Sequence, residues 1–202
     1  MRRRSRDADA RVVHLVAALC LDYPTPEQVE RLPQLAAALA EQPSTPAVTA
    51  LSGLVDHLSG TPLAELQRAY VDVFDLSRKQ TLYLSYWTDG DTRRRGEVLG
   101  RFKAAYRAGG FLVDTHGELP DYLPMVLEFA ARVDPEAGRE LLQAYRPSLE
   151  LMRIGLQEKD SPYAAALVAV CAGLPGESPA DRAAVQAMAG AAGPSVELVG
   201  RA

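Results

Sequence analysis

The sequence predicts an all-α fold, a single-domain helical bundle of about eight to ten helices. Apolar residues recur at three- and four-residue spacing along most of the 202-residue chain. Hydroxyl or acidic residues followed by proline mark several helix starts. The one run that suits a strand, TLYLSYW at 81–87, has no second convincing strand beside which to pair. An unpaired strand leaves its backbone N–H and C=O groups unsatisfied, so we expect a helix there as well.

Composition and charge argue against several classes of protein, namely nucleic-acid-binding, exported and membrane-spanning proteins. The chain is 48% hydrophobic and 24% charged, with a net charge of -4 and a pI near 5.4. An acidic balance argues against general nucleic-acid binding, which needs a basic surface. The two cysteines lie in separate apolar runs. This placement predicts two buried free thiols in the reducing environment of the cytoplasm. The basic N-terminus is interpreted as a frayed tip rather than an export signal, and no apolar run approaches the ~20 residues of a membrane span.

The first half of the chain predicts four helices. Apolar stripes indicate helices over about 11–22, 27–41 and 48–60. Thr61-Pro62, a hydroxyl cap followed by proline, then predicts the start of a helix that carries Leu63 to Phe74.

The second half continues in the same way. One helix should carry Val98 to Tyr106 and end at Gly109-Gly110, and another should start at Leu123. Further starts are predicted at Asp134-Pro135, Ser161-Pro162 and Ser178-Pro179. Pro147 should break the helix that starts at Asp134-Pro135. Ser178 and Asp181 fit a capping box at the last of these starts. We expect 1–192 to form the helical domain and 193–202 to be a flexible tail.

The segment ELPDYLP, residues 118–124, is the main candidate site. Pro120 and Pro124 fix the backbone at a helix start, which holds Asp121 at a defined angle beside Tyr122, while Glu118 adds negative potential. A basic and apolar peptide would suit that arrangement. The structural alternative is that Asp121 is simply the N-cap of its own helix. As a general acid/base pair, Glu118 and Asp121 would need a nucleophile or cofactor motif, and none is present.

Two further clusters are candidates for binding. In TRRRGE, residues 92–97, one arginine could hold a carboxylate bidentately, and we select Arg95. Nearly all the aromatic residues fall between 70 and 130, which favours a peptide groove between helices in which Tyr83 and Trp87 take part. Trp87 either keeps one edge exposed to meet a ligand or belongs to the core. The sequence has no spacing typical of a metal site, and it predicts no cofactor.

Two stretches of the chain resemble a known family. YVDVFDLSRKQTLYLSYWTDGDTRRRGEVL followed by ELPDYLPMVLEFAA is similar to the NarJ family, the delta subunits of respiratory nitrate reductase, within the TorD/DmsD-like maturation chaperones. The shared pattern covers residues 70–131 and includes Tyr70, Phe74-Asp75, Arg78, Gly90, Arg95-Gly96, Glu118 to Asp121 and Leu123-Pro124. Related chaperones have histidine at the position of Tyr122, so a pH-sensitive role is not expected there.

The resemblance implies a cytoplasmic, all-helical and non-catalytic chaperone. Such a protein binds the N-terminal segment of the nitrate reductase catalytic alpha subunit, supports insertion of the molybdenum cofactor and leaves the mature enzyme. On this basis the expected peptide-binding residues are Glu118, Pro120, Asp121, Tyr122, Pro124, Trp87, Tyr83 and Arg95. The alternative is a non-catalytic helical adaptor for another protein segment. An enzyme using Glu118 and Asp121, or a helix-turn-helix regulator using Arg93 to Arg95 and Arg101, fits the sequence less well.

Overall fold

A computed structural model describes residues 8–76, 80–89, 94–111 and 117–191. In these ranges it contains eleven α-helices and one π-helical turn, and no strand. The all-α prediction is therefore confirmed, with slightly more helices than expected. The expected tail, 193–202, lies outside the described residues. Within the described ranges, no helix combines the length and the apolar character needed to cross a bilayer.

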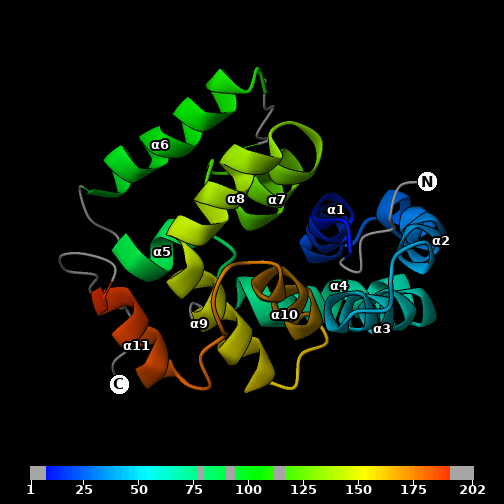
Figure 1. Cartoon of the computed structure of the whole chain (residues 1–202). Helices are drawn as coiled ribbons and strands as arrows, with labels where there is room; N and C mark the ends of the chain where they lie inside the picture. Colours follow the sequence, from blue (N-terminus) through cyan, green and yellow to red (C-terminus); the bar gives the residue numbers. More distant parts are fainter. Residues whose placement is uncertain (1–7, 77–79, 90–93, 112–116, 192–202) are drawn as a thin grey trace.

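The N-terminal helices lie together on one side of the molecule (Figure 1). They are α1 (Ala10–Leu21), α2 (Pro26–Ala40), α3 (Pro46–Gly60) and α4 (Leu63–Tyr70), which continues into the π-helical turn η1 (Val71–Asp75). Helix α1 packs against α2 and α3, and also against α7 and α10 from the second half of the chain. Thr25 and Thr45 cap α2 and α3 through their side chains, each followed by proline. This central position explains why one face of α1 is buried and, apart from His14, apolar.

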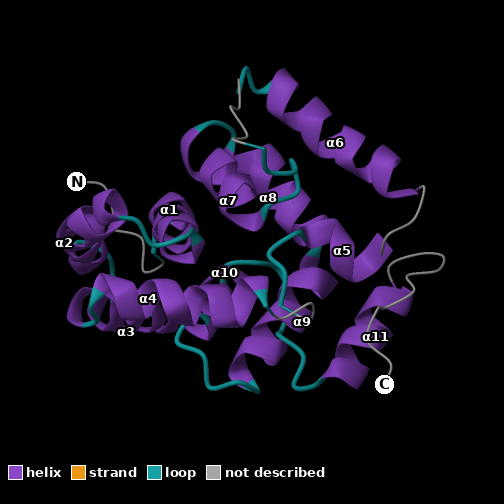
Figure 2. Cartoon of the chain, turned by 180° about the vertical axis from the view of Figure 1, so that it is seen from behind, coloured by secondary structure: helices purple, strands orange, loops and turns teal. Residues whose placement is uncertain are grey.

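The second half supplies the remaining helices (Figure 2). They are α5 (Leu84–Asp89), α6 (Arg94–Ala108), α7 (Leu123–Arg132), α8 (Pro135–Ala144), α9 (Arg146–Gln157), α10 (Ala164–Ala172) and α11 (Arg182–Ala191). Helices α7 and α8 approach closely because Gly138 lacks a side chain: an added Cβ would lie 2.4 Å from the Ala130 Cα. Tyr106 of α6 packs edge-on against Phe129 of α7, with ring centroids 4.9 Å apart.

Three of the predicted helix starts have different caps from those expected. Thr61 donates its hydroxyl back to the His57 carbonyl, so α4 begins at Leu63 without a side-chain cap. The Ser161 hydroxyl is buried and lacks a hydrogen-bond partner among the described residues, and α10 begins only at Ala164. Asp181 alone caps α11, by accepting from Ala184 N, because the Ser178 hydroxyl donates to Glu150 instead. The Asp134 cap of α8 is confirmed.

The run 81–87 is only partly helical. Residues 84–87 belong to α5, but Tyr83 forms an isolated antiparallel bridge with Tyr122. The bridge consists of Leu84 N donating to Asp121 O at 3.0 Å and Leu123 N donating to Leu82 O at 2.8 Å. A distant segment therefore satisfies backbone groups that local sequence alone could not.

Helix α9 contains a buried ionic cluster that the sequence did not indicate. The Glu150 carboxylate is fully buried and accepts from Arg146, Arg153 and Ser178 at 3.2, 2.6 and 2.8 Å. The two arginines also donate to backbone carbonyls of the segment 175–179, namely those of Pro175, Gly176 and Pro179. The cluster thus fastens the connection between α10 and α11 to α9.

Candidate functional site

The segment 118–124 is held by hydrogen bonds to helices from both halves of the chain. Its Pro120 carbonyl accepts from the Tyr106 hydroxyl of α6 at 2.7 Å. Tyr122 N donates to the Leu119 carbonyl at 3.0 Å, which closes a turn just before α7. Pro120 and Pro124 are both buried, and Pro124 lies in the first turn of α7, where a missing N–H carries no penalty. The two buried prolines therefore restrict the backbone conformation of the segment from its inner side.

The Asp121 side chain is completely buried and does not reach the surface. Its Oδ2 accepts from the backbone N–H and the hydroxyl of Ser85, at 2.9 and 2.6 Å. Its Oδ1 has no hydrogen-bond partner among the described residues. Asp121 therefore fixes the start of α5 rather than that of its own helix, whose N-cap is Tyr122 without a side-chain cap bond. In this conformation its carboxylate cannot contact a ligand directly, and a binding role for it stays a prediction.

Tyr122 joins the segment to the end of α1. Its hydroxyl lies 3.2 Å from the Tyr70 hydroxyl and donates to the Asp22 carboxylate at 3.3 Å. The Tyr70 hydroxyl donates to the Leu21 carbonyl at 3.1 Å. Burial raises the pKa of Tyr122, and Tyr70, Asp22 and Glu118 raise it further. The phenol therefore stays protonated at neutral pH.

Tyr83 and Glu118 extend this arrangement toward solvent. The Tyr83 hydroxyl donates to the exposed Glu118 carboxylate, and its ring lies 5.6 Å from that of Tyr122. On the other side, Tyr23 is 39% exposed and its ring meets that of Tyr70 edge-on at 5.4 Å. We call Asp22, Tyr23, Tyr83, Glu118 and Tyr122 the acidic tyrosine surface.

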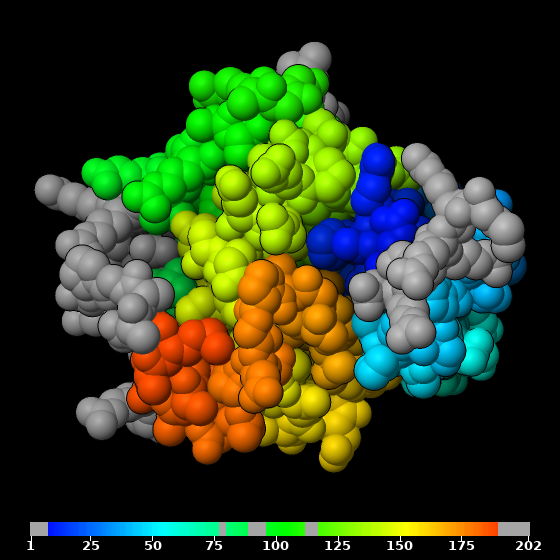
Figure 3. Space-filling view, viewed as in Figure 1, coloured from blue at the N-terminus to red at the C-terminus, as the bar shows by residue number. Residues whose placement is uncertain are grey.

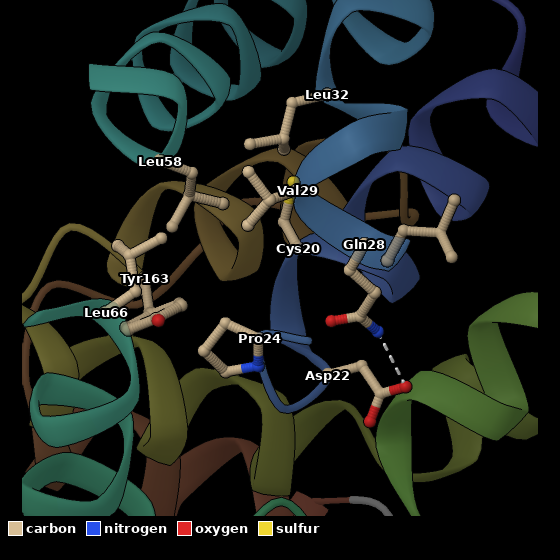
Figure 4. A pocket seen from close by; sticks show the side chains of 10 residues that line it. Cys20, Asp22, Pro24, Gln28, Val29, Leu32, Leu58, Leu66 and Tyr163 are labelled. Atoms are coloured by element: carbon tan, nitrogen blue, oxygen red, sulfur yellow. Dashed lines mark hydrogen bonds between the residues drawn. The ribbon is translucent and has the colours of Figure 1, made fainter. Parts of the chain in front are cut away.

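A small pocket adjoins this surface at Asp22 (Figure 4). Its mostly apolar lining comes from α1, the connection to α2, and α2, α3, α4 and Tyr163: Leu19, Cys20, Asp22, Pro24, Gln28, Val29, Leu32, Leu58, Leu66 and Tyr163. Two of these residues are hydrogen-bonded to each other, with Gln28 donating to Asp22 Oδ2 at 3.0 Å (Figure 4). With a volume of about 20 Å³ it holds little more than one water molecule. It does not accept a side chain in this conformation.

One predicted site residue, Trp87, does not join the surface. Trp87 is only 3% exposed, and its indole N–H donates to the Thr81 carbonyl at 3.0 Å. Of the two alternatives for Trp87, the structure therefore has the core one, with the polar atom of the indole satisfied by Thr81. The side chain of Arg95 lies outside the described residues, as do Arg78 and Gly90 of the shared pattern.

Sequence reasoning missed Asp22 and Tyr23. They lie in LDYPTP, at the end of the first predicted helix and just after it, and an acidic residue followed by tyrosine and flanked by proline also occurs in PDYLP. That similarity was the available signal. What it could not show is that the two segments meet, because about 100 residues separate them in sequence.

Other proteins have a similar fold or a similar sequence. The fold is shared with a protein from Archaeoglobus fulgidus described as a redox enzyme maturation protein, with a TM-score of 0.62 over 85% of this chain and 98% of that chain, at 21% sequence identity. The described helices thus define an all-helical protein of this fold.

The chain belongs to the nitrate reductase delta subunit family, whose model matches residues 40–169. NarJ of Bacillus subtilis (strain 168) is 32% identical over 166 residues, which are 82% of this chain and 90% of that protein. The nitrate reductase molybdenum cofactor assembly chaperone NarJ of Escherichia coli (strain K12) is 28% identical over 152 residues, 74% of this chain and 64% of that protein.

Similarity extends to a much longer protein. The nitrate reductase-like protein NarX of Mycobacterium tuberculosis (strain H37Rv) is 44% identical over 161 residues. The matched part is 79% of this chain but 24% of that protein, so the chain spans about a quarter of its length.

Proposed function

We propose that this chain is a cytoplasmic, non-catalytic chaperone for assembly of a nitrate reductase. It binds the N-terminal segment of the catalytic alpha subunit, supports insertion of the molybdenum cofactor and is absent from the mature enzyme. The observation that carries the proposal is the match of residues 40–169 to the nitrate reductase delta subunit family, supported by the names of the NarJ relatives. We place the binding of the segment at the acidic tyrosine surface.

The chemistry of the acidic tyrosine surface supports this placement. Tyrosine rings offer a large apolar area with a polar tip, as is typical of protein interfaces. Asp22 and Glu118 add two carboxylates at its edges, and the hydrogen bonds of Tyr122 and Tyr83 hold them in position. A peptide with apolar side chains and at least one lysine or arginine complements these groups. Tyr122 is positioned by three buried residues of the same segment, Pro120, Asp121 and Pro124.

Calorimetry with a synthetic copy of the alpha-subunit N-terminal segment tests the proposal. We expect saturable binding that weakens as salt rises, because exposed charges are screened over about 8 Å at physiological ionic strength. Glu118→Gln keeps an acceptor for Tyr83 but removes the charge, so affinity should fall about two- to fivefold, as for an exposed ion pair. Glu140→Gln, an exposed substitution of the same charge change on α8, is the matched control and should leave affinity unchanged.

The possible negative results distinguish a wrong binding site from a wrong partner. If Glu118→Gln and Glu140→Gln bind the peptide equally well, the acidic tyrosine surface is the wrong site, although the partner stands. If neither the peptide nor the intact alpha subunit binds, the proposed partner is wrong. In that case a pull-down from cells that make nitrate reductase would favour the alternative, a helical adaptor, if it recovers a different protein through the same surface.

A further inference from the structure

A second hollow lies at the other end of α1. Helices α1 and α7 run antiparallel: the end of α1 contacts Tyr122 just before α7, and Arg11 near its start donates Nε–H to the Ala131 carbonyl near the end of α7, at 2.7 Å. At that second end is a pocket of about 300 Å³, in the region where the blue surface of α1 adjoins the yellow-green surface of α7 and α8 (Figure 3). Its lining residues are Ala10, Arg11, His14, Ala130, Pro135, Glu136 and Arg139.

Two guanidinium groups at this pocket have unused donors. The Arg11 Nε–H donates to the Ala131 carbonyl, whereas the two terminal nitrogens of Arg11 make no hydrogen bond or ion pair with the described residues. Arg139 is exposed and likewise has no partner among the described residues. Among the described lining residues, Glu136 is the one carboxylate, and it contributes a single negative charge against the two arginines. The described lining residues therefore carry a net positive charge in a chain that is acidic overall, with the Asp9 carboxylate also acting on His14.

A buried histidine forms part of the wall. His14 is 5% exposed, lines the pocket and makes no hydrogen bond with the described residues. Burial lowers its pKa to about 4 despite the opposing effect of Asp9, so the imidazole is neutral at pH 7. A neutral imidazole offers one N–H donor and one acceptor. As part of the lining, the imidazole can exchange a hydrogen bond with a ligand bound in the pocket.

We propose that this pocket binds a small molecule with one oxyanion group, a carboxylate or a phosphate, on an apolar body about the size of a benzene ring. The fork of an arginine matches either oxyanion in a bidentate manner. Ala10, Ala130 and Pro135 provide apolar walls for the body of the ligand. The volume lies at the lower end of the range for ligand sites, which limits the ligand to this size.

Titration of the full chain with benzoate, phenyl phosphate and inorganic phosphate tests this site. The measurement is the NMR signal of the His14 ring together with calorimetry. We expect benzoate and phenyl phosphate to bind saturably at one site and to shift the His14 signal. Arg139→Gln should weaken both about tenfold or more, the size of a lost hydrogen bond to a charged group. Arg31→Gln, an exposed substitution on α2 with the same charge change, should weaken them less than about twofold, as expected for screened charges.

The remaining outcomes decide the proposal. Equal losses in Arg139→Gln and Arg31→Gln, or a linear response without saturation, would show general charge attraction and overturn it. Inorganic phosphate that binds as tightly as phenyl phosphate would overturn the role of the apolar walls. A preference for benzoate or for phenyl phosphate identifies which oxyanion the site takes. Arg11→Gln provides a second test, with its melting temperature measured because Arg11 also contacts Ala131. None of these results depends on the alpha-subunit peptide, so this proposal and the proposed function fail separately.

Discussion

Charged side chains serve opposite purposes in α9 and at the acidic tyrosine surface. In α9, the Glu150 carboxylate is sealed between two guanidinium groups, and every partner belongs to the chain itself. At the acidic tyrosine surface, Asp22 and Glu118 accept hydrogen bonds from tyrosine hydroxyls but keep contact with solvent. A buried charge with all its partners present stabilises one conformation, whereas a partly exposed carboxylate retains capacity for a second molecule.

Asp121 lies between these two cases. It is as buried as Glu150, yet it belongs to the segment that carries Glu118 and Tyr122. Its bonds to Ser85 hold α5 in place, and through the bridge at Tyr83 they position one edge of the surface. A residue in a candidate binding motif can thus act through positioning alone.

The largest expected effect is at Glu150. Glu150→Ala leaves Arg146 and Arg153 buried without their carboxylate, which should lower the free energy of unfolding by about 3–5 kcal/mol. Urea denaturation measures this loss. The control is Glu158→Ala, which removes a surface ion pair with Arg182 and should cost less than about 1 kcal/mol. If the two variants lose the same amount, the buried cluster does not stabilise the fold.

His14 extends the comparison to a buried ionisable side chain that makes no hydrogen bond with the described residues. Its pKa is lowered from 6.5 to about 4, so below pH 6.5 the unfolded chain takes up a proton that the folded chain does not. Stability is therefore fully present above pH 6.5 and falls as the pH drops toward 4, by on the order of 3 kcal/mol from this residue. Denaturation curves of the wild type and of His14→Gln at pH 7 and pH 4.5 measure the effect. The same acid sensitivity in both proteins would show that His14 is not its source.

Asp121 should have a somewhat smaller effect. Asp121→Ala removes the acceptor of two hydrogen bonds from Ser85, and we expect a loss of about 2–3 kcal/mol in the free energy of unfolding. Affinity of the folded fraction for the alpha-subunit peptide should change less than in Glu118→Gln. An unchanged melting temperature combined with a large loss of affinity would mean that Asp121 contacts the ligand and that the buried conformation is not the one that binds.

Trp87 should give the smallest signal. As a buried indole bonded to Thr81, it should emit at short wavelength without peptide, and the emission should not move when peptide is added. Fluorescence titration measures this, and Trp87 is the sole tryptophan, so the signal has one source. A blue shift on binding would show that the loop at 81–83 opens and that the bound segment covers the ring.

The sequence by itself determined the helical class and most helix boundaries, because apolar spacing and proline after a capping residue act over a few neighbouring residues. It also singled out the segment 118–124, through its prolines and its resemblance to a family. Only the tertiary structure decided which side chains of that segment are exposed. Asp121 turned inward because Ser85, 36 positions away, supplies its donors, and Tyr122 turned toward Asp22, 100 positions away. The choice between core and surface for a carboxylate, a phenol or an indole rests on such distant partners, and local sequence does not contain them.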